Sequence, residues 1–249
     1  MISHIKSTVF SILIKKNSSN IKHLGTGFLI GKEGLFFTVG HTFRKIKKEI
    51  ENNGLNNIFV AFPKKQAELI EINRLQYKSI EIYKQKGPTY IDIAVGSIPI
   101  KNDDYLVFKR KRPSNKEKLT AYGYKNMKDN GLHELSENTA NLEKVELKPE
   151  KVNKTHDIAL ISDVRRDYEL SREKVNRSRF FNNCITLDKR LFSGGSGCPI
   201  VDSDGYVRGV LIGSSQIVKS SDMILSKYCT KYIRYHTSIM FDMYQDINS

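Results

Sequence analysis

Short apolar segments recur along most of the chain and constrain its fold more than any other feature. Each is rich in β-branched or aromatic residues and is bounded by turn-forming residues, and several follow one another at intervals of about ten residues. Such spacing is typical of an all-β sandwich or barrel. The clearest segments are STVFSILI (7–14), GTGFLIG (25–31), LFFTVG (35–40), NIFVAF (57–62), AELIEINR (67–74), SIEIYKQ (79–85), YIDIAVGSI (90–98), LTAYGY (119–124), NCITL (183–187) and CPIVDSDGYVRGVLIG (198–213).

Other segments depart from this pattern. HTFRKIKKEIENNG (41–54) has helical character and ends in Asn-Gly, which predicts one helix among the strands. KRKRPSNKEK (109–118) has no periodicity and contains a proline, so we expect it to link two halves of the chain. DSDG (202–205) is typical of a hairpin turn. From about Ser221 the apolar spacing predicts an amphipathic helix at the C-terminus.

Composition excludes several classes of protein. An apolar content of 39% indicates a globular chain. The sequence contains no run of about eighteen apolar residues, which a membrane-spanning helix would need. The first twenty residues lack the pattern of a signal peptide and alternate like a strand. Cys184, Cys198 and Cys229 form no CxxC pair, so we expect neither a disulfide framework nor a zinc site. These features together favour a reducing cytoplasm.

The formal net charge is +14, with basic runs at 44–48, 109–112 and 165–179. Basic patches can bind nucleic acid, but these runs contain no nucleic-acid-binding motif and no interleaved aromatic stacking pattern. We therefore expect a Lys-rich solvated surface and no main role in nucleic-acid binding. Binding of acidic protein partners to this basic surface stays an open possibility.

Three glycines surround one serine in FSGGSGCPIV (192–201). A simple turn needs fewer glycines, so Gly194, Gly195 and Gly197 suggest a backbone that adopts positive φ and lets another molecule approach Ser196. If Ser196 is a nucleophile, a general base must lie elsewhere in the chain. His41 is the strongest of the six histidines for that role, because it directly follows an apolar strand and begins a helix.

A third group must orient the imidazole and stabilise its cation. Asp92 places a carboxylate inside the apolar segment TYIDIAVGSI. A buried carboxylate is costly unless it is paired or hydrogen-bonded, which points to His41 as its partner. Asp157, in the similar segment HDIALIS, is the alternative, but it falls in the second half of the chain.

The order of His41, Asp92 and Ser196 in TVGHTF, DIAV and SGGSGCPIV resembles that of the chymotrypsin-fold serine proteases. The chain is most similar to bacterial trypsin-like and HtrA-type protease domains without PDZ modules, over about residues 5–215, and GTGFLI resembles the strand that precedes their histidine box. The resemblance implies two six-stranded antiparallel β-barrels, over residues 1–112 and 113–220, followed by a C-terminal α-helix over 221–249. The first barrel would carry His41 and Asp92, and the second Ser196.

The resemblance also implies an activity. His41 would take the proton of Ser196 as the serine attacks a peptide carbonyl, and an acyl-enzyme would form and then be hydrolysed. The backbone N–H groups of Gly194 and Ser196 would form the oxyanion hole. No metal or organic cofactor is implied. The expected function is that of a trypsin-like serine endopeptidase acting on protein or peptide substrates.

Two departures from the family pattern concern the serine loop. Gly195 stands where Asn or Asp is common, and Cys198 stands where the family has Gly. Cys198 lies two residues after the nucleophile position, so we expect a small buried side chain and not a cysteine protease.

Specificity is inferred from the same resemblance. The pocket floor lies six residues before the serine in the family, which corresponds to Arg190, and the strand that pairs with substrate corresponds to Ile212, Gly213 and Ser214. Arg190 would favour an acidic residue at the P1 position of the substrate.

The sequence also bears on how the activity would be regulated and on the alternatives to it. Ile2 follows Met1 and no basic cleavage site precedes an Ile-Val start, so we expect no classical zymogen cleavage. A regulatory protein partner could instead act on a loop such as 128–144. Cytoplasmic enzymes of this type also occur in prokaryotic immune systems, which is an analogy at the level of the fold. The alternatives to an active protease are a catalytically silent binding module with the same fold and, less favoured, a basic nucleic-acid-binding protein.

Overall fold

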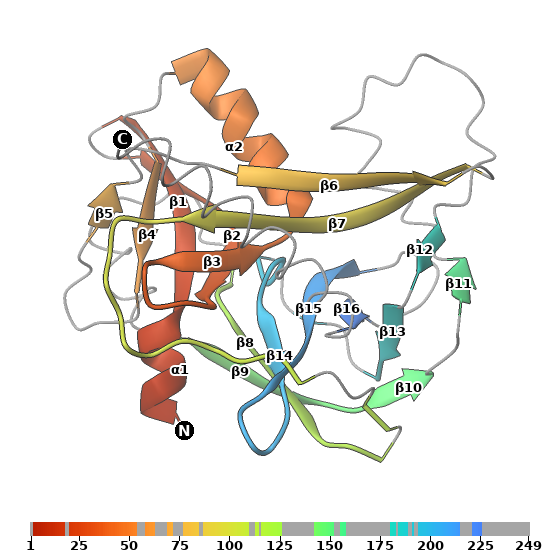
Figure 1. Ribbon diagram of the computed structural model, residues 1–249. Helices are drawn as coiled ribbons and strands as arrows, with labels where there is room; N and C mark the ends of the chain where they lie inside the picture. Colours follow the sequence, from red (N-terminus) through yellow and green to blue (C-terminus); the bar gives the residue numbers. More distant parts are fainter. Residues whose placement is uncertain are drawn as a thin grey trace.

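Two seven-stranded antiparallel sheets, a separate two-stranded sheet and two helices make up the regular structure of the described residues (Figure 1). The computed structural model describes residues 2–17, 20–53, 58–62, 69–71, 77–84, 87–109, 113–114, 116–125, 142–151, 155–157, 180–182, 184–188, 191, 194–214 and 221–225. Every pairing between named strands in these ranges is antiparallel, as expected from the short alternating segments.

The first sheet is built from the first half of the chain, in the order β5-β4-β1-β2-β3-β7-β6. Its strands are β1 (Val9–Asn17), β2 (Asn20–Leu29), β3 (Leu35–Thr38), β4 (Ile58–Ala61), β5 (Leu69–Glu71), β6 (Tyr77–Lys84) and β7 (Gly87–Ser97). The expected hairpin around GKEG is confirmed, because Phe28 of β2 pairs with Phe37 of β3. The predicted helix over 41–54 is also confirmed, as α2 (Gly40–Asn53).

The second sheet has the order β10-β13-β16-β15-β14-β8-β9. Its strands are β8 (Leu119–Gly123), β9 (Glu143–Leu147), β10 (Pro149–Lys151), β13 (Cys184–Leu187), β14 (Pro199–Val201), β15 (Val207–Ser214) and β16 (Ser221–Leu225). The DSDG turn between β14 and β15 is confirmed, with Gly205 at a φ of 86° and its N–H donating to the Asp202 carbonyl at 3.1 Å.

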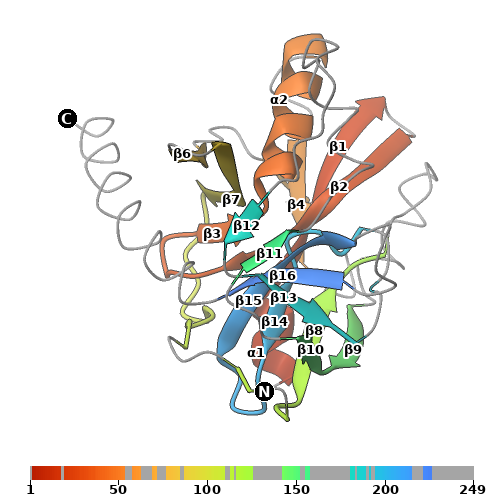
Figure 2. The ribbon, with the colours of Figure 1, turned by 90° about the vertical axis from the view of Figure 1, so that its right-hand side faces the viewer.

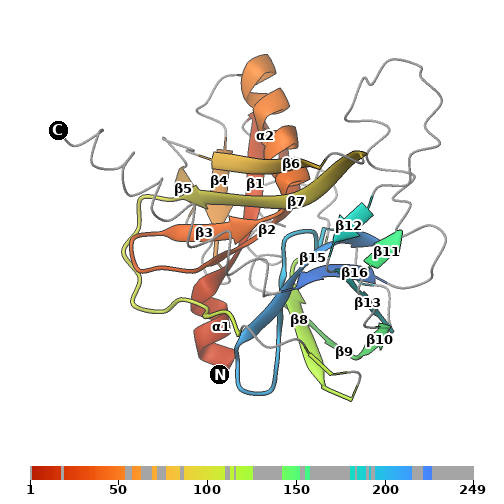
Figure 3. The ribbon, with the colours of Figure 1, turned by 45° about the vertical axis from the view of Figure 1, so that its right-hand side comes forward.

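The two sheets curl beside each other, and the fold is mostly β with few helices (Figures 2 and 3). Half-barrels of this kind agree with the expected chymotrypsin-like double barrel. Each sheet has its own apolar core, because alternate side chains of a strand point to the same face. Phe10, Phe36 and Phe62 cluster in the first core, whereas smaller residues such as Ala121 and Cys198 pack in the second.

Three expectations about the elements are corrected. The chain begins with a helix, α1 (Ile2–Thr8), where a strand was expected, because residues distant in sequence anchor it: the Asn102 side chain donates to the Ser7 carbonyl at 2.8 Å. The segment 221–225 is the strand β16, so the helix expected from Ser221 does not begin there, and residues 226–249 lie outside the described ranges. Each of the two large sheets contains seven strands where six were expected.

The second sheet therefore includes β16, which lies after residue 220, the expected end of the second barrel. The division of the chain into domains at residues 112 and 220 stays a prediction. A separate pair of strands, β11 (Thr155–Asp157) and β12 (Phe180–Asn182), lies outside both sheets, with β12 against β7. Neither described helix is long and apolar enough to cross a lipid bilayer.

Candidate active site

The serine loop, residues 194–198, has the backbone conformation that its glycines predict. Gly194 has a φ of 99° and Gly197 a φ of 90°, both in the region that favours glycine. The Cys198 N–H donates to the Gly195 carbonyl at 2.9 Å, and the Gly197 N–H donates to the Leu211 carbonyl of β15 at 2.8 Å. The loop is thus a tight turn fixed to the second sheet, and its serine is half-buried.

The same loop is also attached to the first sheet. The Thr26 N–H of β2 donates to the Ser196 carbonyl at 2.9 Å, and the Thr26 hydroxyl donates to the Gly194 carbonyl at 3.3 Å. A Cβ atom on Gly197 would overlap with the Thr26 carbonyl and the Thr38 hydroxyl, so only glycine fits between the two sheets there. The loop therefore lies at the junction of the two sheets.

His41 lies in the first turn of α2, at the end of β3, and its side chain is half-buried. This turn is next to the serine loop. A Cβ atom on Gly25 would be 2.6 Å from the Thr42 hydroxyl and 3.2 Å from the Ser196 carbonyl, so one small gap separates all three residues. Thr42, which follows His41, is thus packed against β2, the strand to which the serine loop is attached.

The predicted carboxylate lies on the neighbouring strand. Thr38 of β3 pairs with Ala94 of β7, and Asp92 comes two residues earlier in β7. Because the strands are antiparallel, Asp92 and His41 both lie beyond this pair, in the same direction along the ladder. Packing of α2 against β7 brings the two segments together. The side chain of Asp92 lies outside the described residues.

The alternative carboxylate, Asp157, lies in β11 and pairs with Phe180 of β12. It belongs to neither of the large sheets, although β12 contacts β7. The side chain of Asp157 is likewise outside the described part of the chain.

Comparison with known families adds independent information. Residues 25–210 match a family described as the trypsin-like peptidase domain. The chain belongs to this family. The match begins at Gly25 and ends at Val210, so it includes all three residues that the sequence nominates for the triad. No curated protein matches the chain.

Solved structures show the same fold at low sequence identity. The active form of the Rv3671c protease from M. tuberculosis is 16% identical, with a TM-score of 0.55, covering 90% of this chain and 78% of that one. The MamO protease domain from Magnetospirillum magneticum is 11% identical, with a TM-score of 0.58 and coverage of 93% and 98%. The scabies mite inactivated protease paralogue S-I1 is 12% identical, with a TM-score of 0.58 and coverage of 94% and 96%.

In this trypsin-like peptidase domain, the segment expected to pair with substrate directly follows Leu211, the residue of β15 to which the serine loop is attached. Leu211 donates its N–H to the Cys198 carbonyl at 3.0 Å, and Ile212, Gly213 and Ser214 follow as the end of β15. Gly213 and Ser214 pair with β16 on one side, whereas the described pairs with β14 end at Val210. The expected pocket residue, Arg190, lies outside the described residues.

The Cys198 side chain is completely buried, as expected, and burial raises the pKa of its thiol far above the ordinary value. A thiol held neutral in this way is a poor nucleophile. Among the described residues, no group of three or more His, Cys, Asp or Glu side chains is arranged to hold a metal ion.

GTGFLI matches a family pattern in the sequence, but its threonine was not among the residues predicted for the site. Thr26 is fully buried, and it contacts the serine loop through both its backbone and its side chain. The available signal was a lone hydroxyl between two glycines, Gly25 and Gly27, in an otherwise apolar strand. A polar group in such a place needs a partner.

Proposed function

We propose that this trypsin-like peptidase is an active serine endopeptidase that cleaves protein substrates through an acyl-enzyme. Ser196 is the nucleophile, His41 the general base and then general acid, and Asp92 the carboxylate that holds the imidazole tautomer and stabilises its cation. The observation that carries the proposal is the packing at Gly25, which brings the Ser196 carbonyl and the residue after His41 to the same gap.

The conformation of the loop supports an oxyanion hole formed by the N–H groups of Gly194 and Ser196. Positive φ at Gly194 turns that peptide in a way that a side chain would resist. Donors that are already oriented stabilise the developing negative charge without reorganisation, and loss of one costs about 3 kcal/mol of transition-state stabilisation.

Substrate main chain would lie along Ile212, Gly213 and Ser214. This segment pairs with β16 on one side and continues past the point where the serine loop is attached. A peptide that adds a strand there gains main-chain hydrogen bonds, and its scissile carbonyl approaches Ser196. We further propose that Arg190 favours Asp or Glu at P1. Cleavage of a peptide library with no acidic preference would exclude that role.

A fluorophosphonate probe tests the central proposal, because it reacts only with an activated serine. The wild-type protein should be labelled, and Ser196→Ala should abolish labelling completely. Ser203→Ala is the matched control, since Ser203 is an exposed serine in the β14–β15 turn and should leave labelling unchanged. Asp92→Asn should reduce the labelling rate by roughly 10⁴-fold, and Asp157→Asn should not. If the folded wild-type protein shows no labelling, the chain is a silent member of the fold.

A further inference from the structure

Thr26 joins more parts of the candidate site than any other residue described above, with four hydrogen bonds to three other segments. Its N–H donates to the Ser196 carbonyl at 2.9 Å, and its carbonyl accepts from the Thr38 hydroxyl at 2.7 Å. Its hydroxyl donates to the Gly194 carbonyl at 3.3 Å and accepts from the Tyr124 N–H at 3.4 Å. One buried residue of the first sheet thus contacts two parts of the second half of the chain.

The direction of these bonds fixes the hydroxyl proton. A threonine hydroxyl has one proton to donate and lone pairs to accept. Because the Tyr124 N–H donates to the hydroxyl oxygen, the proton of the hydroxyl is directed to the Gly194 carbonyl. Thr26 is fully buried, so water does not compete for either bond.

The serine loop needs such a restraint, because three of its first four residues are glycines with wide conformational freedom. The bond from the Thr26 N–H already fixes the Ser196 carbonyl. The second bond acts two residues earlier, on the Gly194 carbonyl, and the φ of 99° at Gly194 relates the peptide that carries this carbonyl to the peptide that carries the Gly194 N–H. Backbone and side chain of Thr26 therefore hold the loop at two points.

We propose that the Thr26 hydroxyl is a positioning group for the oxyanion hole. It holds Gly194 in its positive-φ conformation, so that the Gly194 N–H is oriented before substrate arrives. This inference rests on the proposed function. It predicts that loss of the hydroxyl slows the chemical step and leaves substrate binding nearly unchanged, because the donor acts on charge that develops in the transition state.

Thr26→Val is the first test, since it keeps the backbone bond and the shape of the side chain but removes the hydroxyl. We expect kcat and the rate of fluorophosphonate labelling to fall about 10- to 100-fold, with KM within about twofold of wild type. Thr26→Ser keeps the hydroxyl and should stay within about threefold of wild type in kcat. Thr8→Val is the matched control, because Thr8 is equally buried and its hydroxyl bonds only to carbonyls within α1.

The possible outcomes separate this inference from the proposed function. If the wild-type protein is neither labelled nor active, the proposed function is wrong and this inference falls with it. If the wild type is active and Thr26→Val keeps its kcat, or loses activity only through a higher KM, the positioning role alone is wrong. Thr26→Val leaves the Tyr124 N–H and the Gly194 carbonyl without this partner, so it could fail to fold. Thr26→Ala and Thr26→Ser then decide, since they differ only by the hydroxyl, and equal kcat values would overturn the role.

Discussion

The two ends of β14 differ in the charge of the groups that hold them. Before the strand, the serine loop is fixed by neutral hydrogen bonds, by two positive-φ glycines and by close packing between the sheets. After the strand, the hairpin of residues 202–206 also has backbone hydrogen bonds and a positive-φ glycine, Gly205, but charged side chains fix it in addition. Because β14 is only three residues long, the two ends are about 10 Å apart, which makes them a direct comparison within one element.

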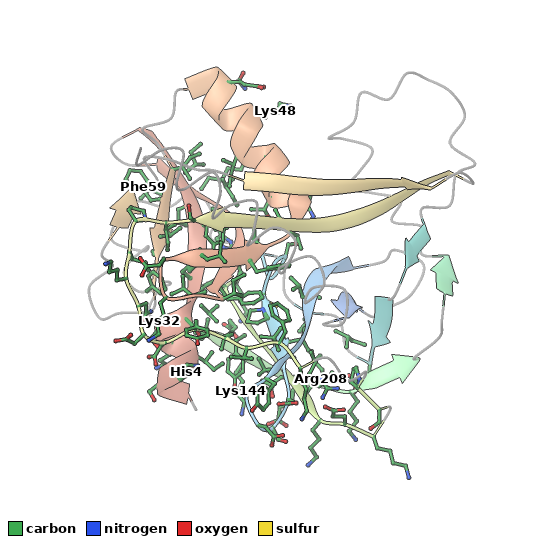
Figure 4. All side chains as sticks on the ribbon, in the orientation of Figure 1. His4, Lys32, Lys48, Phe59, Lys144 and Arg208 are labelled. Atoms are coloured by element: carbon green, nitrogen blue, oxygen red, sulfur yellow. The ribbon has the colours of Figure 1, made fainter. Side chains whose placement is uncertain are left out.

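The hairpin end contains a partly buried ion network. Arg208 of β15 is 1% exposed, and its guanidinium donates to Asp202 at 3.2 Å and to Glu117. The ammonium of Lys109 lies 3.2 Å from both Asp202 and Asp204. In Figure 4, Arg208 lies in the lower half of the molecule, whereas Lys48 on α2 marks the opposite end. The network ties Lys109 and Glu117, near the two ends of the predicted linker over 109–118, to the second sheet.

The difference follows from what each end must do. If Ser196 is the nucleophile, as proposed above, its loop needs donors in fixed positions, and neutral bonds to glycine backbone provide them without placing extra charge beside it. The hairpin contains none of the proposed catalytic residues and needs only to stay closed, so long charged side chains suffice. Burial lowers the pKa of Arg208, as expected when a cation loses water, so the network carries a desolvation cost. Removal of one charged partner is destabilising for a separate reason, because it leaves the remaining buried charges with fewer counter-charges.

The largest effect should come from Gly197→Ala at the neutral end. The added Cβ would sit on a residue with a φ of 90° and would overlap with the Thr26 carbonyl and the Thr38 hydroxyl. Backbone strain and overpacking each cost about 2 kcal/mol, so we expect a loss of about 4 kcal/mol in the free energy of unfolding. Labelling by a fluorophosphonate should fall below detection. Urea unfolding and labelling of the folded protein measure the two effects.

Gly31→Ala is the matched control for that substitution. A Cβ on Gly31 would lie 3.4 Å from the Leu35 side chain, an ordinary contact, and its φ is not in the left-handed region. If Gly197→Ala lowers the free energy of unfolding and the labelling no more than Gly31→Ala does, the serine loop does not depend on close packing between the sheets, and the contrast drawn between the two ends of β14 is wrong.

The second effect in size should come from Arg208→Met at the charged end. The substitution leaves the buried carboxylate of Asp202 and the neighbouring Glu117 without this cation. Removal of one partner from a buried ion network costs about 3 kcal/mol in the free energy of unfolding. The labelling rate of the folded protein should not change, because the serine loop is held by other residues.

Lys144→Met provides the reference for Arg208. Lys144 forms an ion pair with Glu146 at 3.5 Å, and both side chains are largely exposed. Such pairs are worth less than about 1 kcal/mol. If Arg208→Met lowered the labelling rate while stability stayed the same, the two ends would be coupled, and the division of roles between them would be wrong.

Much of the fold could be predicted because strands and turns leave local signals. The hairpin around GKEG, the helix after β3 and the turn at Gly205 all follow from residues close together in sequence. The errors at the two ends of the chain have a common cause. Residues 2–8 and 221–225 are short segments whose structure depends on partners distant in sequence: α1 is anchored through Asn102 and Asp104, and β16 through β13 and β15.

The candidate site was only partly visible in the sequence for a related reason. Positive φ at Gly194 and Gly197 could be inferred, because glycine has a distinct conformational preference. The position of Thr26 between the two sheets could not be inferred, since it depends on contacts to Ser196 and Tyr124, residues far away in the chain. Spacing along a chain does not encode which hydroxyl meets which carbonyl.

The smallest loss in the free energy of unfolding should come from Lys109→Met. This substitution tests whether a charged group at the hairpin end contributes more to stability when it is more deeply buried. Lys109 is about a third exposed, unlike Arg208, and its ammonium also lies 5.3 Å from the centre of the Tyr206 ring. The hydrogen bonds to Asp202 and then to Asp204 raise the pKa of Lys109 above its ordinary value of 10.5. Solvent screening of this half-exposed group should make its loss clearly smaller than that of Arg208.

The pH dependence of the free energy of unfolding tests whether the charge of Lys109 stabilises the fold. A lysine whose pKa is higher in the folded state than in the unfolded state stabilises the fold fully below the unfolded value, and this contribution disappears as the pH rises through the folded value. The difference in free energy of unfolding between wild type and Lys109→Met should therefore be constant near neutral pH and shrink above pH 10.5. Lys101→Met, at an exposed lysine of the preceding segment, is the control for the loss of a lysine side chain. A Lys109 difference that stayed constant across that range would mean that packing of its aliphatic stem, and not its charge, stabilises the hairpin end.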